Sequence, residues 1–204
     1  MMKLYYSPGA CSLSPHIVLR EAGIPFEIEK VNLKTKKTEA GIDYDTINPK
    51  SYVPALVMNN GELLTEGPAI VQYVADLAPE KKLAPPAGTL ERYRLQEWLN
   101  YISSEIHKGF GPLFNPKAAE DIKDAARARV SKRIGFAATA LEGKNYLLGD
   151  TFSVADAYFF TILRWTHFVG IDLSPWPGLK EYLKRVAARP AVISAIKAEG
   201  LPAD

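Results

Sequence analysis

The sequence has little cysteine and little histidine: one Cys and three His among 204 residues. A single cysteine cannot form an internal disulfide, and a structural zinc site would need several histidines, whereas these three lie far apart in the chain. We therefore expect neither a disulfide framework nor a metal centre. The one thiol is left with two interpretations, a small buried apolar group or a reactive nucleophile.

The sequence also lacks long apolar runs and a strong excess of either charge. Its 25 basic and 23 acidic residues are interspersed and give a net charge of +2, so we expect no extended basic face for nucleic acid. The N-terminal stretch "MMKLYYSPGA" is interrupted by Pro8 and Gly9 before a signal-peptide core could form. With 47% hydrophobic residues the chain can bury a full core, and we expect a globular cytoplasmic protein without a membrane partner.

The first 80 residues alternate between short strand and helix patterns. The expected strands cover residues 3–6, 26–33, 53–58 and 62–64. An Asn-Gly pair, Asn60-Gly61, predicts a tight two-residue turn in a hairpin between the last two. Helices are expected from Ser14 to Gly23 and from Thr65 onward, while residues 34–47 are interpreted as a loop with a weak helix. The order is βαβ, an irregular link, and ββα, which is an α/β arrangement.

The composition changes after residue 79. Prolines and charges gather in "APEKKLAPPAGT", which is typical of a linker, and the remainder shows helical patterning. We therefore predict an α/β domain over residues 1–79, a linker over 80–89 and an all-helical domain over 90–204. The expected helices of the last part cover residues 90–110, 120–141, 153–169, 178–188 and 191–199.

The lone thiol, Cys11, lies at the turn between the first strand and the first helix. Pro15 is tolerated only in the first turn of a helix, so this helix begins at or just before Ser14. A cysteine at this position would face the N–H groups of the helix, and these groups favour a reactive thiolate. Inert packing is the competing interpretation, because free cysteine is often buried.

Two further segments indicate a peptide-like ligand. In "YVPAL", Pro54 cannot donate to a strand ladder, so the backbone of Val53 is a candidate to pair with an extended peptide, the more so if the Val53–Pro54 bond is cis. In "TEGPAI", Glu66 could accept an ammonium group and the backbone of Gly67 could approach a carboxylate. An ordinary strand start and an ordinary helix cap remain the alternatives.

A third pattern lies on the first helix of the second half. Asn100, Ser104 and His107 are spaced at i, i+4 and i+7, which places them on one polar stripe. His107 and Lys108 stand beside "GFGPLF", whose glycines and aromatic residues favour a cleft. Elsewhere, Ser153 and Asp156 form a capping-box pattern, and His16 and His167 are interpreted as packing residues.

In this order the features resemble the cytosolic glutathione transferases, and more closely their bacterial beta class. The segments that carry the resemblance are spread over most of the chain: "YYSPGACSLSPHI", "NPKSYVPAL", "LLTEGPAIVQYVAD", "EWLNYISSEIHKGFGPLF" and "YLLGDTFSVADAYFF". The resemblance implies a thioredoxin-like N-terminal domain, an all-helical C-terminal domain, a homodimer, and glutathione as co-substrate. It also implies a cis peptide bond before Pro54.

The resemblance further implies a set of site residues. Cys11 and His107 are expected to act in catalysis, with Cys11 facing the glutathione sulfur. The residues expected to bind glutathione are Ala10, Cys11, Lys36, Val53, Pro54, Glu66, Gly67, Asn100, Ser104, Glu105, His107 and Lys108. Asn100, Ser104 and Glu105 could reach the site of the partner subunit. The expected electrophile pocket consists of Pro112, Leu113, Phe114, Trp165 and Phe168.

The function implied is transfer of the glutathione thiolate to small apolar electrophiles, as in detoxification. Two alternatives stay open. Cys11 could serve a glutathione-dependent disulfide reductase or dehalogenase, or the fold could be a non-catalytic binding module.

Overall fold

A computed structural model describes residues 1–202 of the chain. It consists of two compact units, each with its own core. The first contains Met1–Ala84 together with the chain from Ala187 onward, and the second is Pro85–Val186. The division between Ala84 and Pro85 falls inside the segment that the sequence marks as a linker.

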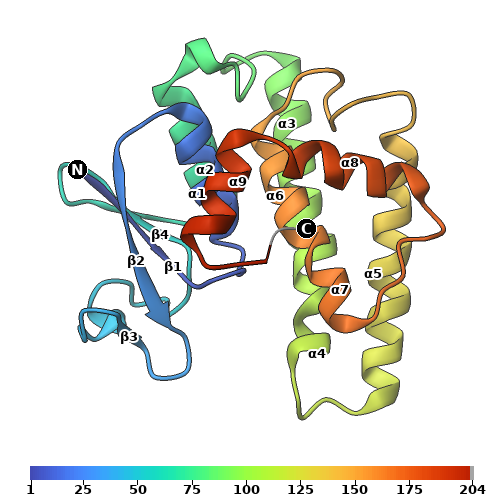
Figure 1. The fold of residues 1–204 in the computed structure, drawn as a ribbon, viewed down its shortest axis with the longest axis horizontal. Helices are drawn as coiled ribbons and strands as arrows, with labels where there is room; N and C mark the ends of the chain where they lie inside the picture. Colours follow the sequence, from blue (N-terminus) through green and yellow to red (C-terminus); the bar gives the residue numbers. More distant parts are fainter. Residues whose placement is uncertain (203–204) are drawn as a thin grey trace. The chain divides into compact units, whose positions relative to one another are not determined.

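A five-stranded mixed sheet forms one layer of the first unit (Figure 1). Its strand order is β3-β2-β1-β4-β5, and the strands are β1 (Met2–Tyr6), β2 (Phe26–Asn32), β3 (Lys37–Thr38), β4 (Ala55–Val57) and β5 (Leu63–Thr65). Strands β1 and β2 are parallel, and the other pairs are antiparallel. Helix α1 (Leu13–Ala22) connects the parallel pair, and α2 (Gly67–Leu77) follows β5. The expected βαβ and ββα order is therefore confirmed.

Two local details of this unit differ from the expectations. The hairpin between β4 and β5 is not closed by a two-residue Asn-Gly turn, because Met58 and Glu62 are the last hydrogen-bonded pair and three residues lie between them. Gly61 takes the left-handed conformation there, with φ at 84°. In the irregular link, the expected weak helix is only the 3-10 turn η1 (Tyr44–Thr46), preceded by the short strand β3.

The last helix, α9 (Pro190–Ala198), belongs to the first unit and not to the helical one. Figure 1 shows it beside α1, from the opposite end of the chain, so that α1, α2 and α9 lie together on one side of the sheet. Arg20 Nη1 donates to Ser194 Oγ at 2.8 Å, and Arg189 donates to both carboxylate oxygens of Glu21. These bonds explain why the boundary differs from the expected 90–204: the end of the chain pairs with α1, which sequence periodicity cannot reveal.

A buried polar chain ends at the turn that carries Cys11. Arg20 Nε donates to His16 Nε2 at 2.9 Å, so the proton of the His16 ring is on Nδ1, which donates to Glu199 Oε1 at 2.8 Å. The other oxygen of Glu199 accepts the N–H of Gly9 at 3.0 Å. The side chains of His16 and Glu199 are both fully buried. His16 is thus inside, as expected, but as the centre of a polar network.

The second unit is helical throughout. Its elements are α3 (Leu90–Tyr101), the π-helical segment η3 (Ile102–Ile106), the 3-10 segment η4 (His107–Phe110), α4 (Gly111–Phe114), α5 (Glu120–Ala140), α6 (Val154–Leu163), α7 (Trp165–Val169) and α8 (Pro177–Ala187). The expected single helix over 90–110 is therefore wrong, since the backbone widens to a π-turn after Tyr101. The expected helix over 153–169 is divided at Arg164.

Helix α6 is the core of the second unit, and all ten of its residues are buried. A helix that is enclosed on every side needs its polar groups paired. Asp156 supplies that pairing: its carboxylate accepts the N–H and hydroxyl of Ser153, the N–H of Leu147 and the hydroxyl of Tyr182. Burial raises the pKa of Asp156, and this effect is larger than that of the hydrogen bonds, which lower the pKa. The expected capping box is confirmed.

We expect Glu199→Ala to lower the free energy of unfolding by about 3 to 5 kcal/mol, because it leaves the fully buried His16 ring without its acceptor and also removes the acceptor that Glu199 offers to the half-buried Gly9 N–H. Glu199→Gln, which keeps one acceptor, should cost less. Urea denaturation measures both changes. Glu80→Ala, at an exposed position, is the control and should change the value by less than about 0.5 kcal/mol. A loss in Glu199→Ala no larger than the control's would contradict this account of the buried chain.

Candidate functional site

Cys11 lies between β1 and α1, and its thiol is half-buried. The thiol donates to the carbonyl oxygen of Val53, with Sγ and O 3.4 Å apart. The two residues are 42 positions apart in the sequence, so the sheet brings them together. Residue 11 is therefore accessible and directed at the segment that precedes β4, and it is not sealed in the core.

The first N–H groups of α1, which the sequence places near the thiol, have backbone acceptors of their own. The Leu13 N–H donates to Ala10 O at 3.0 Å, and the Ser14 N–H donates to Cys11 O at 3.2 Å. These first-turn donors are taken up by the backbone of the turn itself. The turn is closed further by the N–H of Ala10, which donates to Ser7 O. The dipole of α1 acts on this region, and the thiol itself donates to the Val53 carbonyl.

The backbone at Val53 lies outside the sheet ladder. Pairing of β1 with β4 runs from Lys3 and Val57 to Tyr5 and Ala55, and it ends there. The Val53–Pro54 bond is cis, as the resemblance implies. Gly67 stands next to this bond, since a Cβ built on it would lie 4.0 Å from Pro54 Cγ. Cys11, Val53, Pro54 and Gly67 are thus contiguous in the first unit.

Glu66 is the N-cap residue of α2, with a left-handed φ of 69°. Its Oε1 accepts the Tyr52 hydroxyl at 2.5 Å and the Lys50 ammonium at 3.1 Å. The hydrogen bond that each donates to Glu66 raises the pKa of Lys50 and that of Tyr52. Sequence reasoning identified Glu66 but missed Lys50 and Tyr52. The one sequence feature that could have pointed to them is their spacing: Lys50 and Tyr52 are separated by a single residue, Ser51.

The loop that holds these side chains is anchored from inside the unit. Tyr44 and Asn48 are buried, and the Tyr44 hydroxyl and the Asn48 amide both donate to Tyr52 O, at 3.0 and 2.7 Å. Burial raises the pKa of Tyr44 to about 12, so its hydroxyl remains a donor at all physiological pH values. Lys36 reaches the same loop, where its ammonium donates to Ser51 O at 2.7 Å. Lys36, Ser51, Tyr52 and Glu66 therefore form one continuous polar rim.

In the second unit, His107 is part of an aromatic group. Its Nδ1 lies 2.6 Å from the Tyr158 hydroxyl, and its ring meets that of Trp165 edge-on with centroids 4.9 Å apart. Trp165 also contacts Phe110 and Phe114, with centroids 5.5 and 5.4 Å apart. The expected neighbourhood of His107, Phe114 and Trp165 is thus present, and Tyr158 is the partner that sequence reasoning missed.

The other residues expected in the second unit are spread over η3, η4 and their surroundings. Asn100 and Ser104 are exposed, and the Ser104 hydroxyl donates to Asn100 O at 2.9 Å. Glu105 pairs with Arg133 at 2.9 Å, and Lys108 is exposed. The π-turn lies between Asn100 and His107, so these two do not share the stripe of a regular α-helix.

The remaining residues expected in the electrophile pocket lie on α4 and α7. Pro112 and Leu113 lie half-buried on α4, beside Phe114. Phe168 is 67% exposed, and its ring packs against His167. The interpretation of His167 as a packing residue is wrong, because that side chain is exposed as well. The place of Phe168 in an electrophile pocket stays a prediction.

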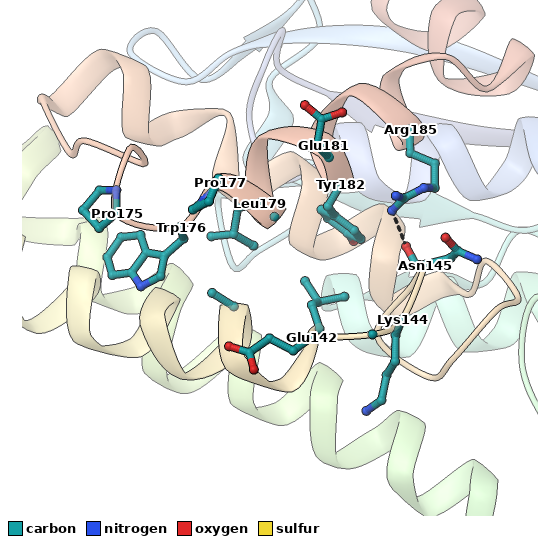
Figure 2. Close-up of a pocket in the computed structure, with 14 residues that line it drawn as sticks. Glu142, Lys144, Asn145, Pro175, Trp176, Pro177, Leu179, Glu181, Tyr182 and Arg185 are labelled. Carbon is teal, nitrogen blue, oxygen red and sulfur yellow. Dashed lines mark hydrogen bonds between the residues drawn. The ribbon is translucent and has the colours of Figure 1, made fainter.

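A pocket of about 420 Å³ lies in the second unit, between the end of α5, the loop after it and the start of α8 (Figure 2). The Trp176 indole lines it and lies against Gly135, where a Cβ would come within 3.1 Å of the ring. Arg185 closes one end by donating to Asn145 O at 2.9 Å. Its lining includes none of the residues expected to bind glutathione or the electrophile.

Residues 1–202 contain neither a membrane-spanning helix nor a cluster of metal-ligating side chains. No helix in this range is long and apolar enough to cross a membrane. No group of three or more His, Cys, Asp or Glu side chains within the same range could hold a metal ion.

Comparison with known proteins agrees with the geometry. Residues 9–77 match the model of the glutathione S-transferase N-terminal domain, and residues 101–190 match that of the C-terminal domain. The chain is 46% identical over 200 residues to the glutathione S-transferase GstA of Escherichia coli O157:H7, covering 98% of this chain and all of that one.

Solved structures show the same relation. A bacterial beta class glutathione S-transferase from Sphingomonas chungbukensis has a TM-score of 0.95 at 50% identity, over 98% of this chain and all of the other. A sphingomonad glutathione S-transferase complexed with glutathione has a TM-score of 0.95 at 49% identity, with the same coverage. With two domain models in register and full-length relatives at this identity, the chain belongs to the glutathione transferase family, in its bacterial beta class.

Proposed function

We propose that this chain binds glutathione along the contiguous residues of its first unit and transfers the glutathione thiolate to small apolar electrophiles. The observation that carries the proposal is the approach of Cys11 to Val53 beside a cis Pro54, next to Glu66 and Gly67 at the start of α2. A relative at 49% identity has been solved with glutathione bound.

The chemistry of the tripeptide matches the groups of the first unit one by one. Glutathione is an extended peptide with an ammonium group, two carboxylates and a thiol. The backbone of Val53 lies beyond the ladder and can pair with the cysteinyl backbone. Glu66 can accept from the ammonium group of glutathione. The Gly67 N–H at the start of α2 can donate to the adjacent carboxylate, and Lys36 can pair with the glycyl carboxylate. Ala10 and Cys11 would then face the sulfur.

Activation of the thiol is the first chemical step. Cysteine thiols ordinarily have a pKa near 8.5, so lowering it by one unit raises the thiolate fraction at neutral pH by up to about tenfold. The dipole of α1 and a donor from His107 would stabilise the anion. Because this effect is modest, holding the electrophile against the sulfur must supply the larger part of the acceleration. We assign the binding of the electrophile to Trp165, Phe114 and the other residues expected in the pocket.

Tyr158 sets the proton position of His107 in this scheme. When the Tyr158 hydroxyl donates to Nδ1, the ring proton is on Nε2, and the imidazole presents an N–H donor at its other end. Tyr158 itself is buried, so the orientation of the ring is fixed by the core of the second unit. Tyr158 is thereby a positioning residue, with His107 as the residue that meets the anion.

We also propose that the chain acts as a homodimer. Trp98, Tyr101 and Phe136 form an aromatic cluster across α3 and α5, and Phe136 is 60% exposed. Tyr93, on α3, is 59% exposed. Asn100 and Ser104 are exposed on the same stretch of the chain, which suits the contribution to the partner's site that the resemblance implies. A cytoplasmic location stays a prediction.

The first test uses immobilised glutathione and a panel of aromatic and halogenated electrophiles. The chain should be retained on the glutathione column and should form thioether products. Passage through the column would overturn the proposal and favour the binding-module alternative.

Substitution of Cys11 separates conjugation from redox chemistry. In Cys11→Ala we expect conjugation to remain within about tenfold of wild type, because the glutathione sulfur is the nucleophile, and we expect disulfide reduction with glutathione to be lost. Both rates are measured on the same preparation, with Ser7→Ala, on the same turn, as the control. Loss of conjugation together with reduction would show instead that Cys11 forms part of the transfer step.

We expect Tyr158→Phe to lower kcat/KM for conjugation about fivefold, the equivalent of one hydrogen bond of about 1 kcal/mol. The pH profile should shift as well, because the ring of His107 is no longer held in one tautomer. Tyr101→Phe, which removes a hydroxyl that donates to Arg133 O, is the matched control and should leave both unchanged. An unaltered pH profile in Tyr158→Phe would rule out the positioning role.

The dimer is tested by placing a charge on the aromatic face. Phe136→Glu should shift the mass measured by analytical ultracentrifugation from dimer to monomer at micromolar concentration, since a buried unpaired carboxylate opposes association. Ile193→Glu, at an exposed position of α9, should leave the mass unchanged. A stable dimer in Phe136→Glu would move the interface away from this face.

A further inference from the structure

The carboxylate of Glu66 already holds an ammonium group, and that group comes from the chain itself. Lys50 Nζ lies 3.1 Å from Glu66 Oε1 and 2.9 Å from Thr65 Oγ1. The cation is therefore held by a carboxylate and a hydroxyl at the start of α2. This is the coordination that the ammonium group of a γ-glutamyl ligand would need at the same place.

The position of Lys50 is set by the buried anchor of its loop. The Lys50 N–H donates to Asn48 Oδ1 at 3.1 Å, while the Asn48 amide donates to Tyr52 O at 2.7 Å, and Asn48 is 1% exposed. One buried side chain thus holds the backbone on both sides of Ser51. The flexible part of Lys50 is its side chain, about half of which is exposed. The ammonium can leave Glu66 without any change in the backbone.

Tyr52 keeps the carboxylate in place whether or not Lys50 is bound. Its hydroxyl donates to Oε1 of Glu66 at 2.5 Å, and its own backbone carbonyl is held by Tyr44 and Asn48. Glu66 therefore stays oriented by a neutral donor when a cation departs. An exchange of one ammonium group for another then needs only the movement of a lysine side chain.

We propose that Lys50 is a built-in competitor for glutathione: its ammonium occupies the subsite of the γ-glutamyl ammonium and is displaced when the tripeptide binds. The inference rests on the proposed binding of glutathione by Glu66. Two ammonium groups on one carboxylate repel each other, so both do not remain there. The observed affinity is then the intrinsic affinity reduced by the fraction of molecules in which Lys50 has left.

The competition also favours ligands that carry the ammonium group. When glutathione displaces the lysine, its ammonium group forms a charge-assisted hydrogen bond to Glu66 in place of the one that Lys50 gives up. A γ-glutamyl peptide whose amine is acylated has no cation to offer, so it leaves the Lys50–Glu66 pair in place. Lys50 thereby sets a requirement for a free amine at this end of the site.

The test is Lys50→Met, which keeps the length of the side chain and removes its charge. Isothermal titration calorimetry should give a Kd for glutathione about two- to fivefold lower than that of the wild-type protein, the range expected for release of an exposed ion pair. Lys30→Met removes the same charge from an exposed position of β2 and should leave the Kd unchanged. N-acetylglutathione, the probe without a free amine, should bind Lys50→Met and the wild-type protein with the same Kd, because it leaves the Lys50–Glu66 pair in place; a gain as large as that of glutathione would also overturn the inference. An unchanged or higher Kd for glutathione in Lys50→Met would overturn the inference.

Glu66→Gln distinguishes this inference from the proposed function. If that variant binds glutathione as tightly as wild type, the assignment of the γ-glutamyl end to Glu66 fails, and the competitor role of Lys50 fails with it. If Glu66→Gln binds more weakly while Lys50→Met shows no gain, only the competitor role is overturned. In the double variant we expect the Kd of Glu66→Gln alone, because Lys50 then has no carboxylate to occupy.

Discussion

The carboxylate of Glu199 is the interaction on which the geometry around Cys11 depends. A fully buried carboxylate is stable only when its oxygens are paired, and here one oxygen accepts from His16 and the other from the N–H of Gly9. Gly9 lies two residues before Cys11, so the turn carrying the thiol is tied to the end of the chain. The packing of Leu201 against Gly9, at 3.4 Å from where a Cβ would be, reinforces the tie.

This constraint explains why the last helix belongs to the first unit. Residues 187 onward supply Arg189, Ser194 and Glu199 to α1, and in exchange α1 offers Glu21, Arg20 and His16. The His16–Glu199 pair satisfies groups that would otherwise be buried without partners, and the other two pairs are part-buried. A thiol turn supported from only one side by β1 would have a loose backbone, whereas this one is held at Gly9, at Ala10 and at the first turn of α1.

The local parts of the fold could be predicted from the sequence, and the long-range parts could not. Gly23 ends α1 with a left-handed φ, as its position after an apolar periodic run indicates. The π-turn after Tyr101 has no comparable signal, because nothing in "ISSEI" opposes a regular helix. His16 and Glu199 are 183 residues apart, and Lys50 and Glu66 are 16 apart in a stretch without periodicity. Sequence patterns report neighbours along an element, so pairings of this kind become visible only when the fold exists. The cis bond before Pro54 came from the resemblance and not from the pattern of residues.

The start of α2 shows how the binding of a zwitterion is divided between backbone and side chains. Pro68 has no N–H, and the Ala69 N–H is used by Glu66 O at 3.0 Å, so Gly67 is the one residue of this first turn placed to donate its backbone N–H to an anion. A single N–H with the helix dipole gives a carboxylate only part of the stabilisation that several donors would. Recognition of the γ-glutamyl end must then depend more on its ammonium, and therefore on Glu66. The left-handed backbone of Glu66, the hydroxyl of Tyr52 and the ammonium of Lys50 all act on that one carboxylate, so specificity at this end is governed by which cation it holds.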